Sequence, residues 1–233
     1  MRIFRHLKTE WFRYGFETIA VVVGILVAFA LDNWNEERKL HKEELELLVD
    51  IQANLEATIE NLILDTIGHT EDIFLYQRIE AYVINDLPYS IELDSAFGRL
   101  RLWRSPYTTS AAYKTLQSKG LEIIQNEALK NDIVQMYEVT YLELSDDYDR
   151  SEWNLSQSII NPFFSKHIRN LHHTSLYMAR PNDFESLKKN EEFLNILSLL
   201  LRQRKRGLEY YDVAMSAMNK LVRDIDKELA SRL

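Results

Sequence analysis

The sequence predicts an all-α membrane protein, in which one N-terminal transmembrane helix continues into a long-helix bundle outside the membrane. Three observations lead to this prediction. Residues 18–31 carry no charge. Glycine and proline are scarce, with six and four in 233 residues, which disfavours a turn-rich β protein. Apolar residues also recur at steps of three and four after the uncharged stretch and again near the C-terminus, as they do on one face of a helix.

Residues 16–34 are expected to cross the membrane as one helix. A helix needs about 20 mostly apolar residues to cross the hydrocarbon core, and the uncharged stretch reaches this length when it is extended on both sides. Tyr14 and Trp34 lie near its two ends, where aromatic residues anchor spans at the membrane interface. The chain is thereby divided into a short basic cytoplasmic tail (residues 1–15), the span, and an extramembrane helical-bundle domain (residues 35–233).

Two other interpretations of the apolar stretch remain open. Ala28-Phe29-Ala30 resembles the small-x-small site at which a signal peptide is cleaved. Glu17 at the start of the stretch and the uninterrupted helical pattern after it favour an uncleaved span. The stretch could also be the buried helix of a soluble domain, because it is apolar on all sides.

The flanking charges predict the orientation of the span. Four basic residues precede it, whereas the three basic residues that follow it are mixed with six acidic ones. Flanks rich in lysine and arginine stay in the cytoplasm. We therefore expect a cytoplasmic N-terminus, and in a bacterium an inner-membrane anchor with a periplasmic C-terminal domain.

Ala20, Gly24 and Ala28 form a face of small residues along the span. Small residues four apart let two helices approach closely in lipid, so this face predicts a homo-oligomer or a membrane-protein partner, although such residues are common in other spans too. Glu17 lies near the same face, seven residues before Gly24. It either snorkels to the interface and pairs with Arg13, or acts as an intramembrane acid that contacts a partner helix or lines an ion path.

The run from Glu17 to Ala28 reads ETIAVVVGILVA, and NWNEERK follows from Asn33; AYKTL and GLEII occur later, from Ala112 and Gly120. These residues resemble an uncharacterised family of bacterial single-span membrane proteins. In that family a Glu-led span containing Gly-Ile-Leu runs into an Asn-Trp-Asn-Glu-Glu-Arg-Lys juxtamembrane helix, and Asp32 stands here where Asn is expected. The resemblance implies a bacterial origin and a place in the membrane, and it implies no catalytic residue.

The extramembrane part is expected to begin as a continuation of the span. Neither glycine nor proline occurs between Leu26 and Ile67, so one helix should run to about residue 67 and end at Gly68. A shorter, mostly buried helix over residues 73–84 then stops at Asn85-Asp86-Leu87-Pro88. The apolar stripe of the first helix comprises Leu45, Leu48, Leu55, Ile59 and Leu62.

Short elements are predicted next. Residues 94–102 are expected to be helical, and Ser105-Pro106 is a break. Thr108 or Thr109 is expected to cap a short helix that extends to Lys119 and is closed by Gly120 in the left-handed conformation.

A long helix is expected to begin after Asn126, which suits the N-cap position, and to end at Asn161-Pro162. Residues 163–182 have mixed polarity and are interpreted as a connector with some helix.

The last predicted helix carries the clearest pattern. Its apolar residues alternate steps of four and three over more than four heptads, interrupted only by Arg204. Such a seam occurs in intermolecular coiled coils and in bundle helices of one chain; two other long helices are available here, which favours the bundle. The seam comprises Leu197, Leu201, Leu208, Tyr211, Met215, Met218, Val222, Ile225 and Leu229.

The sequence contains no recognisable catalytic, metal or cofactor pattern. Because cysteine is absent, disulfides, thiolate zinc sites and thiol nucleophiles are excluded. His167, His172 and His173 are not spaced to place two ligands on one helix face. A net charge of −8 gives no sign of a nucleic-acid-binding domain. We expect no enzyme activity, cofactor, metal or nucleic-acid partner.

Three other clusters have structural explanations. The acidic stretch 145–149 is interpreted as a solvated helix face. A basic cluster is expected to pair with acids of neighbouring helices rather than with lipid; it comprises Arg202, Arg204, Lys205 and Arg206. An aromatic cluster is expected to lie in the core rather than around a pocket; it comprises Phe97, Trp103, Tyr107 and Tyr113.

The sequence thus predicts a scaffold or interaction protein, anchored in membrane lipid, that self-associates or docks on another membrane protein. Two alternatives remain. One is an accessory subunit of an ion-conducting or ion-driven complex that uses Glu17, and the other is a ligand-sensing extracytoplasmic helical bundle.

Overall fold

The computed structural model describes residues 3–171 and 177–232, and it confirms the all-α fold class. Contacts divide the chain into two units, Met1–Leu48 and Val49–Leu233. The helices and turns of the described residues are α1 (Ile3–Ile84), η1 (Ile91–Leu93), α2 (Asp94–Arg99), α3 (Ala111–Lys119), η2 (Leu121–Ile123), α4 (Glu127–Gln135), η3 (Met136–Thr140), η4 (Glu143–Asp149), α5 (Arg150–Leu155), η5 (Ser156–Ile160), α6 (Asn161–His167), α7 (Phe184–Lys188) and α8 (Glu191–Ser231); the strands are β1 (Ile168–Asn170) and β2 (Ala179–Pro181).

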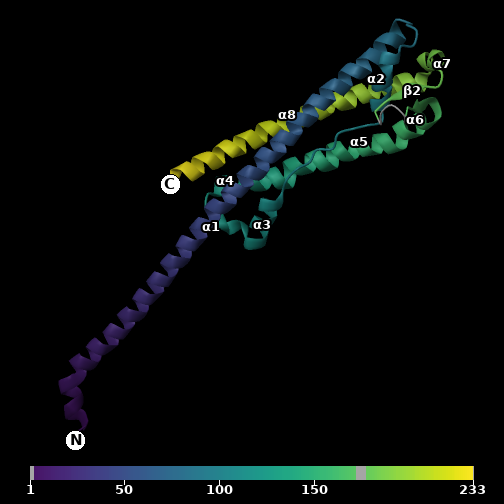
Figure 1. Cartoon of the computed structure of the whole chain (residues 1–233). Helices are drawn as coiled ribbons and strands as arrows, with labels where there is room; N and C mark the ends of the chain where they lie inside the picture. The colour runs from purple at the N-terminus through teal and green to yellow at the C-terminus, as the bar shows by residue number, and fades with distance from the viewer. Residues whose placement is uncertain (1–2, 172–176, 233) are drawn as a thin grey trace. The chain divides into compact units, whose positions relative to one another are not determined.

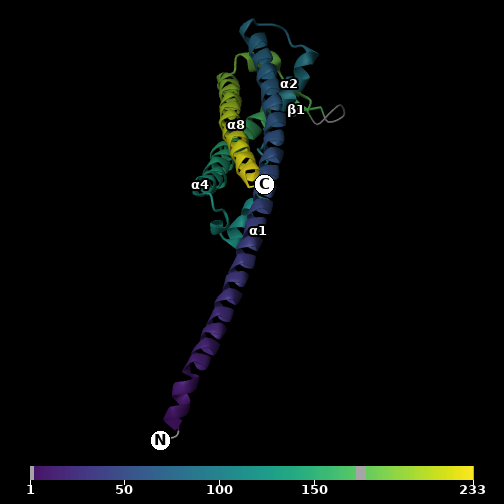
Figure 2. The same cartoon turned by 90° about the vertical axis from the view of Figure 1, so that its left-hand side faces the viewer.

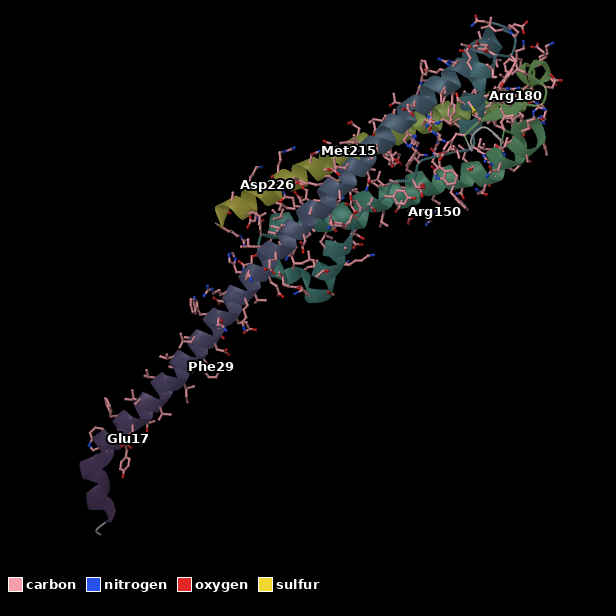
Figure 3. All side chains as sticks on the ribbon, viewed as in Figure 1. Glu17, Phe29, Arg150, Arg180, Met215 and Asp226 are labelled. Atoms are coloured by element: carbon pink, nitrogen blue, oxygen red, sulfur yellow. The ribbon has the colours of Figure 1, made fainter. Side chains whose placement is uncertain are left out.

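The first unit is the N-terminal part of α1. All residues from 14 to 40 are exposed, and the apolar stretch is helical throughout. By length and composition this helix could cross a membrane. Its apolar side chains project from the helix, as Phe29 does in Figure 3.

In the second unit, three long helical segments pack side by side (Figures 1 and 2). They are the part of α1 that follows Leu48, the helical run of residues 127–167, and α8. The ring of His69 on α1 lies 5.3 Å from the ring of Tyr211 on α8. The hydroxyl of Tyr141, on the middle segment, donates a hydrogen bond of 3.2 Å to Thr58 on α1. These contacts make the second unit a helical bundle.

The helix α1 passes through Gly68 without a break, so the predicted end at Gly68 is wrong. A Cβ added at Gly68 would lie 1.7 Å from the Nε atom of Arg104. Glycine is therefore needed here for close packing, at a cost of roughly 1 kcal/mol in helix propensity. The stop at Asn85 and Asp86 is confirmed, because α1 ends at Ile84.

The short helix α3 begins at Ala111 after Ser110, so the predicted caps Thr108 and Thr109 are wrong. The backbone N–H of Thr109 instead donates to Thr58 Oγ1 on α1, at 3.0 Å, which holds this residue outside the helix. The predicted end is confirmed, since α3 ends at Lys119 and Gly120 follows. The predicted left-handed helical conformation of Gly120 is wrong: its φ of 105° is combined with a ψ of 134°, an extended conformation that also favours glycine.

The middle segment begins as predicted, because the side chain of Asn126 accepts a hydrogen bond from the Leu129 N–H. The predicted end at Asn161-Pro162 is wrong: helix continues to His167. Pro162 lies in the first turn of α6, directly after a π-helical turn, where a missing N–H is tolerated. The segment contains three such π-helical turns, η3, η4 and η5.

The predicted connector contains a small antiparallel sheet after α6. Ile168 of β1 pairs with Pro181 of β2, and both Ile168 and Ala179 are buried. Gly98 of α2 lets this segment approach closely, because a Cβ there would lie 1.9 Å from the carbonyl oxygen of Tyr177. This hairpin is the only β-structure among the described residues.

The helix α8 is capped by Asn190, whose side chain accepts a hydrogen bond from the Phe193 N–H. Four of the nine predicted seam residues, Leu197, Tyr211, Met218 and Ile225, are at most 2% exposed, and so is Arg204 between them. Leu201 is also buried, whereas Leu208, Met215, Val222 and Leu229 are only partly buried. The second buried line comprises Leu200, Gly207, Ala214 and Leu221. The helix therefore presents a wide face to the bundle of this chain.

Candidate functional site

A non-helical segment, residues 100–110, connects α2 to α3 along the bundle. Buried side chains donate hydrogen bonds to carbonyl oxygens in and beside it. Tyr76 donates to Arg99 (2.9 Å), Arg204 to Leu102 (2.5 Å) and Tyr211 to Arg104 (3.3 Å). An unpaired buried carbonyl is unfavourable, so these polar side chains explain how a non-helical segment packs inside a helical bundle.

Arg204 is the centre of a buried ionic cluster, and its side chain is 1% exposed. Its guanidinium forms an ion pair with Glu152, and its Nε lies 4.0 Å from the carboxylate of Asp72. All three side chains come from different helical segments of the bundle. The interruption in the seam of α8 is thus the residue that joins the other two long helices, and pairing with neighbouring acids is confirmed for Arg204.

His69 and Tyr148 extend this cluster. The Tyr148 hydroxyl donates a hydrogen bond of 2.9 Å to Glu152 and lies 3.1 Å from Nε2 of His69. Tyr148 has one hydroxyl proton and gives it to Glu152, so His69 donates its Nε2 proton to Tyr148. Burial, with help from the positive charges of Arg204 and Arg104, lowers the pKa of His69 to about 3. His69 is therefore neutral at physiological pH.

The acid–base properties of the cluster favour a structural role. Burial raises the pKa of Tyr76 to about 12 and raises the pKa of Tyr148 and Tyr211 further. Burial also raises the pKa of the Asp72 carboxyl, against the opposing charges of Arg99 and Arg204. At neutral pH the tyrosines remain protonated and His69 uncharged, so they act as hydrogen-bonding groups of fixed protonation.

A cavity of about 490 Å³ adjoins the ionic cluster. Its volume lies within the range of small-molecule pockets. Asp72 and Arg99 in its wall form an ion pair of 3.2 Å, and the Trp103 indole donates to Asp149 at 3.1 Å. The lining residues are Asp72, Arg99, Leu102, Trp103, Arg104 and Tyr177. This cavity is the candidate site of the second unit.

The structure places the predicted span residues on one exposed helix in the first unit. Glu17 is labelled near the N-terminal end of α1 in Figure 3. A Cβ added at Gly24 would meet no atom within 4 Å, so the face that it shares with Ala20 and Ala28 is open. The side chain of Arg13, the predicted partner of Glu17, lies outside the described residues.

The two aromatic residues at the ends of the span are both exposed, Tyr14 by 54% and Trp34 by 60%. The guanidinium of Arg38 lies 5.9 Å from the centroid of the Trp34 ring. Exposed aromatic side chains with polar edges suit a membrane interface.

Of the three histidines considered as metal ligands, His167 stacks on Phe163 with ring centroids 4.5 Å apart. His172 and His173 lie outside the described residues. Among the residues that the structure does describe, no three His, Asp or Glu side chains are arranged to hold a metal ion.

The other clusters are only partly as predicted. Asp146 and Asp147 are exposed, as expected for a solvated face, but Tyr148 between the acids is fully buried. Of the four aromatic residues near Pro106, Phe97 and Tyr113 are buried, Tyr107 is 74% exposed and Trp103 lines the cavity. Lys205 and Arg206 are exposed, and Arg206 donates a hydrogen bond to Tyr210.

The sequence did not point to His69, Asp72 or Glu152 as members of a site. The sequence feature that could have indicated this cluster was Arg204, a charged residue inside an apolar seam. Gly207 was another: a Cβ there would lie 2.4 Å from the Tyr148 hydroxyl, so glycine inside α8 marks close packing against the cluster.

Comparisons of the chain with protein-family models, with curated proteins and with solved structures found no match. Its resemblance to a family of bacterial single-span proteins stays a prediction.

Proposed function

We propose that this protein is a membrane-anchored helical scaffold or interaction protein without catalytic activity. The observation that carries the proposal is the uncharged stretch of α1, residues 18–31, every residue of which is exposed in the described structure. Exposed apolar surface of this extent is unfavourable in water and matches the hydrocarbon core of a bilayer. The flanking charges support a cytoplasmic N-terminus and a periplasmic second unit in a bacterial inner membrane.

Self-association through the face formed by Ala20, Gly24 and Ala28 is the preferred mode of interaction. Close backbone approach stabilises helix pairs in lipid, and the space around Gly24 permits it. Docking of the same face on a different membrane protein is the other mode that the small residues would serve.

The proposal is tested by measuring the mass of the intact protein in mild detergent by light scattering, with the detergent contribution subtracted. We expect a defined homo-oligomer. The variant Gly24→Leu should shift the mass to that of the monomer, because a leucine side chain holds the two backbones apart.

Val22→Leu is the matched control, since residue 22 lies on a different side of the helix and should leave the oligomer intact. A monomeric native protein would contradict self-association and direct the search to a different partner. An oligomer of unchanged mass in Gly24→Leu would show that the interface lies elsewhere.

A further inference from the structure

The cavity wall is held in one arrangement by the interior of the bundle. The carbonyl oxygens of Leu102 and Arg104 accept hydrogen bonds from Arg204 and Tyr211. The indole of Trp103, which lies between them in the chain, donates to Asp149. Three consecutive lining residues are thus fixed, two by buried side chains of α8 and one by the partly exposed Asp149 of the middle segment. A preformed wall of this kind lowers the entropic cost of binding a ligand.

Arg104 stands apart from the other charged residues of the cavity. Its guanidinium packs against α1 at Gly68, where the absence of a Cβ leaves room for it. Its Nε atom is buried and has no hydrogen-bond partner. Nowhere in the described residues does its guanidinium form an ion pair or a hydrogen bond, whereas Arg99 in the same wall pairs with Glu71 and Asp72.

The charge of Arg104 acts on the carboxyls of Asp65 and Asp72, but no acid among the described residues contacts its guanidinium directly. An arginine that lines a cavity without a direct ion pair is suited to receive an anion. Guanidinium groups bind carboxylates through two parallel hydrogen bonds, and such charge-assisted bonds are about twice as strong as neutral ones. The Asp72 carboxylate in the same wall repels anions, and it repels a ligand with two negative charges more strongly than a ligand with one. Leu102 and Trp103 offer apolar surface for the remainder of the ligand.

We propose that this cavity binds a small organic monocarboxylate, with the carboxylate on Arg104 and the apolar body of the ligand against Leu102 and Trp103. The site would give the extramembrane bundle a small-molecule ligand, and it does not depend on whether the span self-associates.

Binding is measured by isothermal titration calorimetry on the full chain in detergent micelles. The probes are phenylacetate, its neutral analogue phenylacetamide, and inorganic phosphate. We expect phenylacetate to bind with one site per chain, and phenylacetamide and phosphate to bind at least about tenfold more weakly, since phenylacetamide lacks the negative charge and phosphate lacks the apolar body.

Arg104→Gln should weaken phenylacetate binding by at least about tenfold, the loss expected for one charge-assisted hydrogen-bond pair. The matched control is Arg101→Gln. Arg101 belongs to the same segment, but its guanidinium lies over the Phe164 ring at 5.3 Å and does not line the cavity. This control should bind phenylacetate as the native chain does.

A second variant, Arg104→Lys, keeps the charge but loses the paired donors, and should bind between the native chain and Arg104→Gln. Helix content is checked by circular dichroism, and the comparison is read from whichever of the two Arg104 variants folds.

Equal affinity for phenylacetate and phenylacetamide, tight binding of phosphate, or native affinity in a folded Arg104 variant would overturn the proposal. So would the absence of phenylacetate binding at about 10 mM, where a ligand of even millimolar affinity is bound.

Discussion

At Arg204, a guanidinium lies in the interior of the bundle and contacts an acid on a neighbouring helix and a backbone carbonyl of the segment between α2 and α3. Desolvation of these charges offsets much of their attraction, so the cluster is not expected to stabilise the fold more than apolar residues would. Its effect is to fix one arrangement of the three long helices and of residues 100–110. The burial of Arg204 is therefore explained by its hydrogen bond to the non-helical segment, residues 100–110.

Arg204→Leu should lower the free energy of unfolding by about 3–5 kcal/mol, because it leaves Glu152 buried without its counter-ion. Urea denaturation followed by circular dichroism, on the full chain in detergent, measures this change. Arg202→Leu is the control: residue 202 is exposed on the same helix and should change stability by less than about 0.5 kcal/mol. Equal stability of the two variants would contradict the role of the buried ion pair.

His69 makes the stability of the second unit depend on pH. Its folded pKa of about 3 lies below the ordinary histidine pKa of 6.5, so between these values the unfolded chain binds a proton that the folded chain does not. Stability contributed by neutral His69 is therefore complete above about pH 6.5 and falls as the pH decreases, by up to about 1.4 kcal/mol per pH unit.

The variant His69→Gln should lack this component. Urea denaturation of both proteins at pH 7 and pH 5 should show that the free energy of unfolding decreases more for the native chain than for the variant. Other titrating groups, Asp72 included, are present in both proteins and cancel in the comparison. Parallel pH profiles would contradict the buried neutral state of His69.

Among the elements, the π-helical turn η4 and the helix α8 fit together at a single glycine. Tyr148 lies in η4, and its hydroxyl occupies the space where a Cβ of residue 207 would be. Alanine has a better helix propensity than glycine by about 1 kcal/mol, so propensity alone would make Gly207→Ala stabilising. Packing against Tyr148 predicts instead that Gly207→Ala is destabilising.

We expect Gly207→Ala to destabilise the protein by about 1–3 kcal/mol, the usual range for an overpacked interior. Thermal unfolding compared with that of Ser216→Ala, an exposed site on the same helix, provides the measurement. The control should show little change. A more stable Gly207→Ala would mean that Tyr148 moves without cost and does not fix the two helices.

Elements that depend on local signals could be predicted from the sequence. The cap at Asn126, the closure at Gly120 and the stop after Ile84 each follow from one or two residues and their neighbours in the chain. The helix ends predicted at Gly68 and Pro162 were wrong for two reasons. Gly68 packs against Arg104, which is 36 positions later in the sequence. Pro162 follows a π-helical turn that the sequence did not predict. Tertiary packing overrides local propensity at such positions.

The candidate cavity could not be predicted from the sequence either, because it depends on tertiary packing. Its lining comes from α1, from the end of α2, from the non-helical segment and from Tyr177. The stretch around Trp103 was recognised as aromatic, but its neighbour Arg104 carried no signal until the packing against Gly68 was known. In α8 the predicted seam omitted Gly207 and Ala214, since small residues do not mark an apolar face although they are buried in one.

The whole molecule consists of an exposed apolar helix in Met1–Leu48 and a helical bundle in Val49–Leu233. The bundle contains its own buried core and ionic cluster, whereas no residue that the structure describes covers the apolar stretch of the first unit. In our proposal a bilayer supplies that covering, and the flanking charges predict which side each flank lies on. The proposed topology is therefore one span with the bundle outside the cytoplasm.

The absence of native cysteine allows this claim to be measured directly. Single cysteines are introduced by Thr9→Cys before the span and by Ser216→Cys on the exposed face of α8, and bacterial cells expressing each variant are treated with a membrane-impermeant maleimide. With the outer membrane made permeable, cysteine 216 should be labelled in otherwise intact cells, and cysteine 9 only after the inner membrane is opened. Labelling of cysteine 9 alone, or of both or neither before the inner membrane is opened, would contradict the proposed topology.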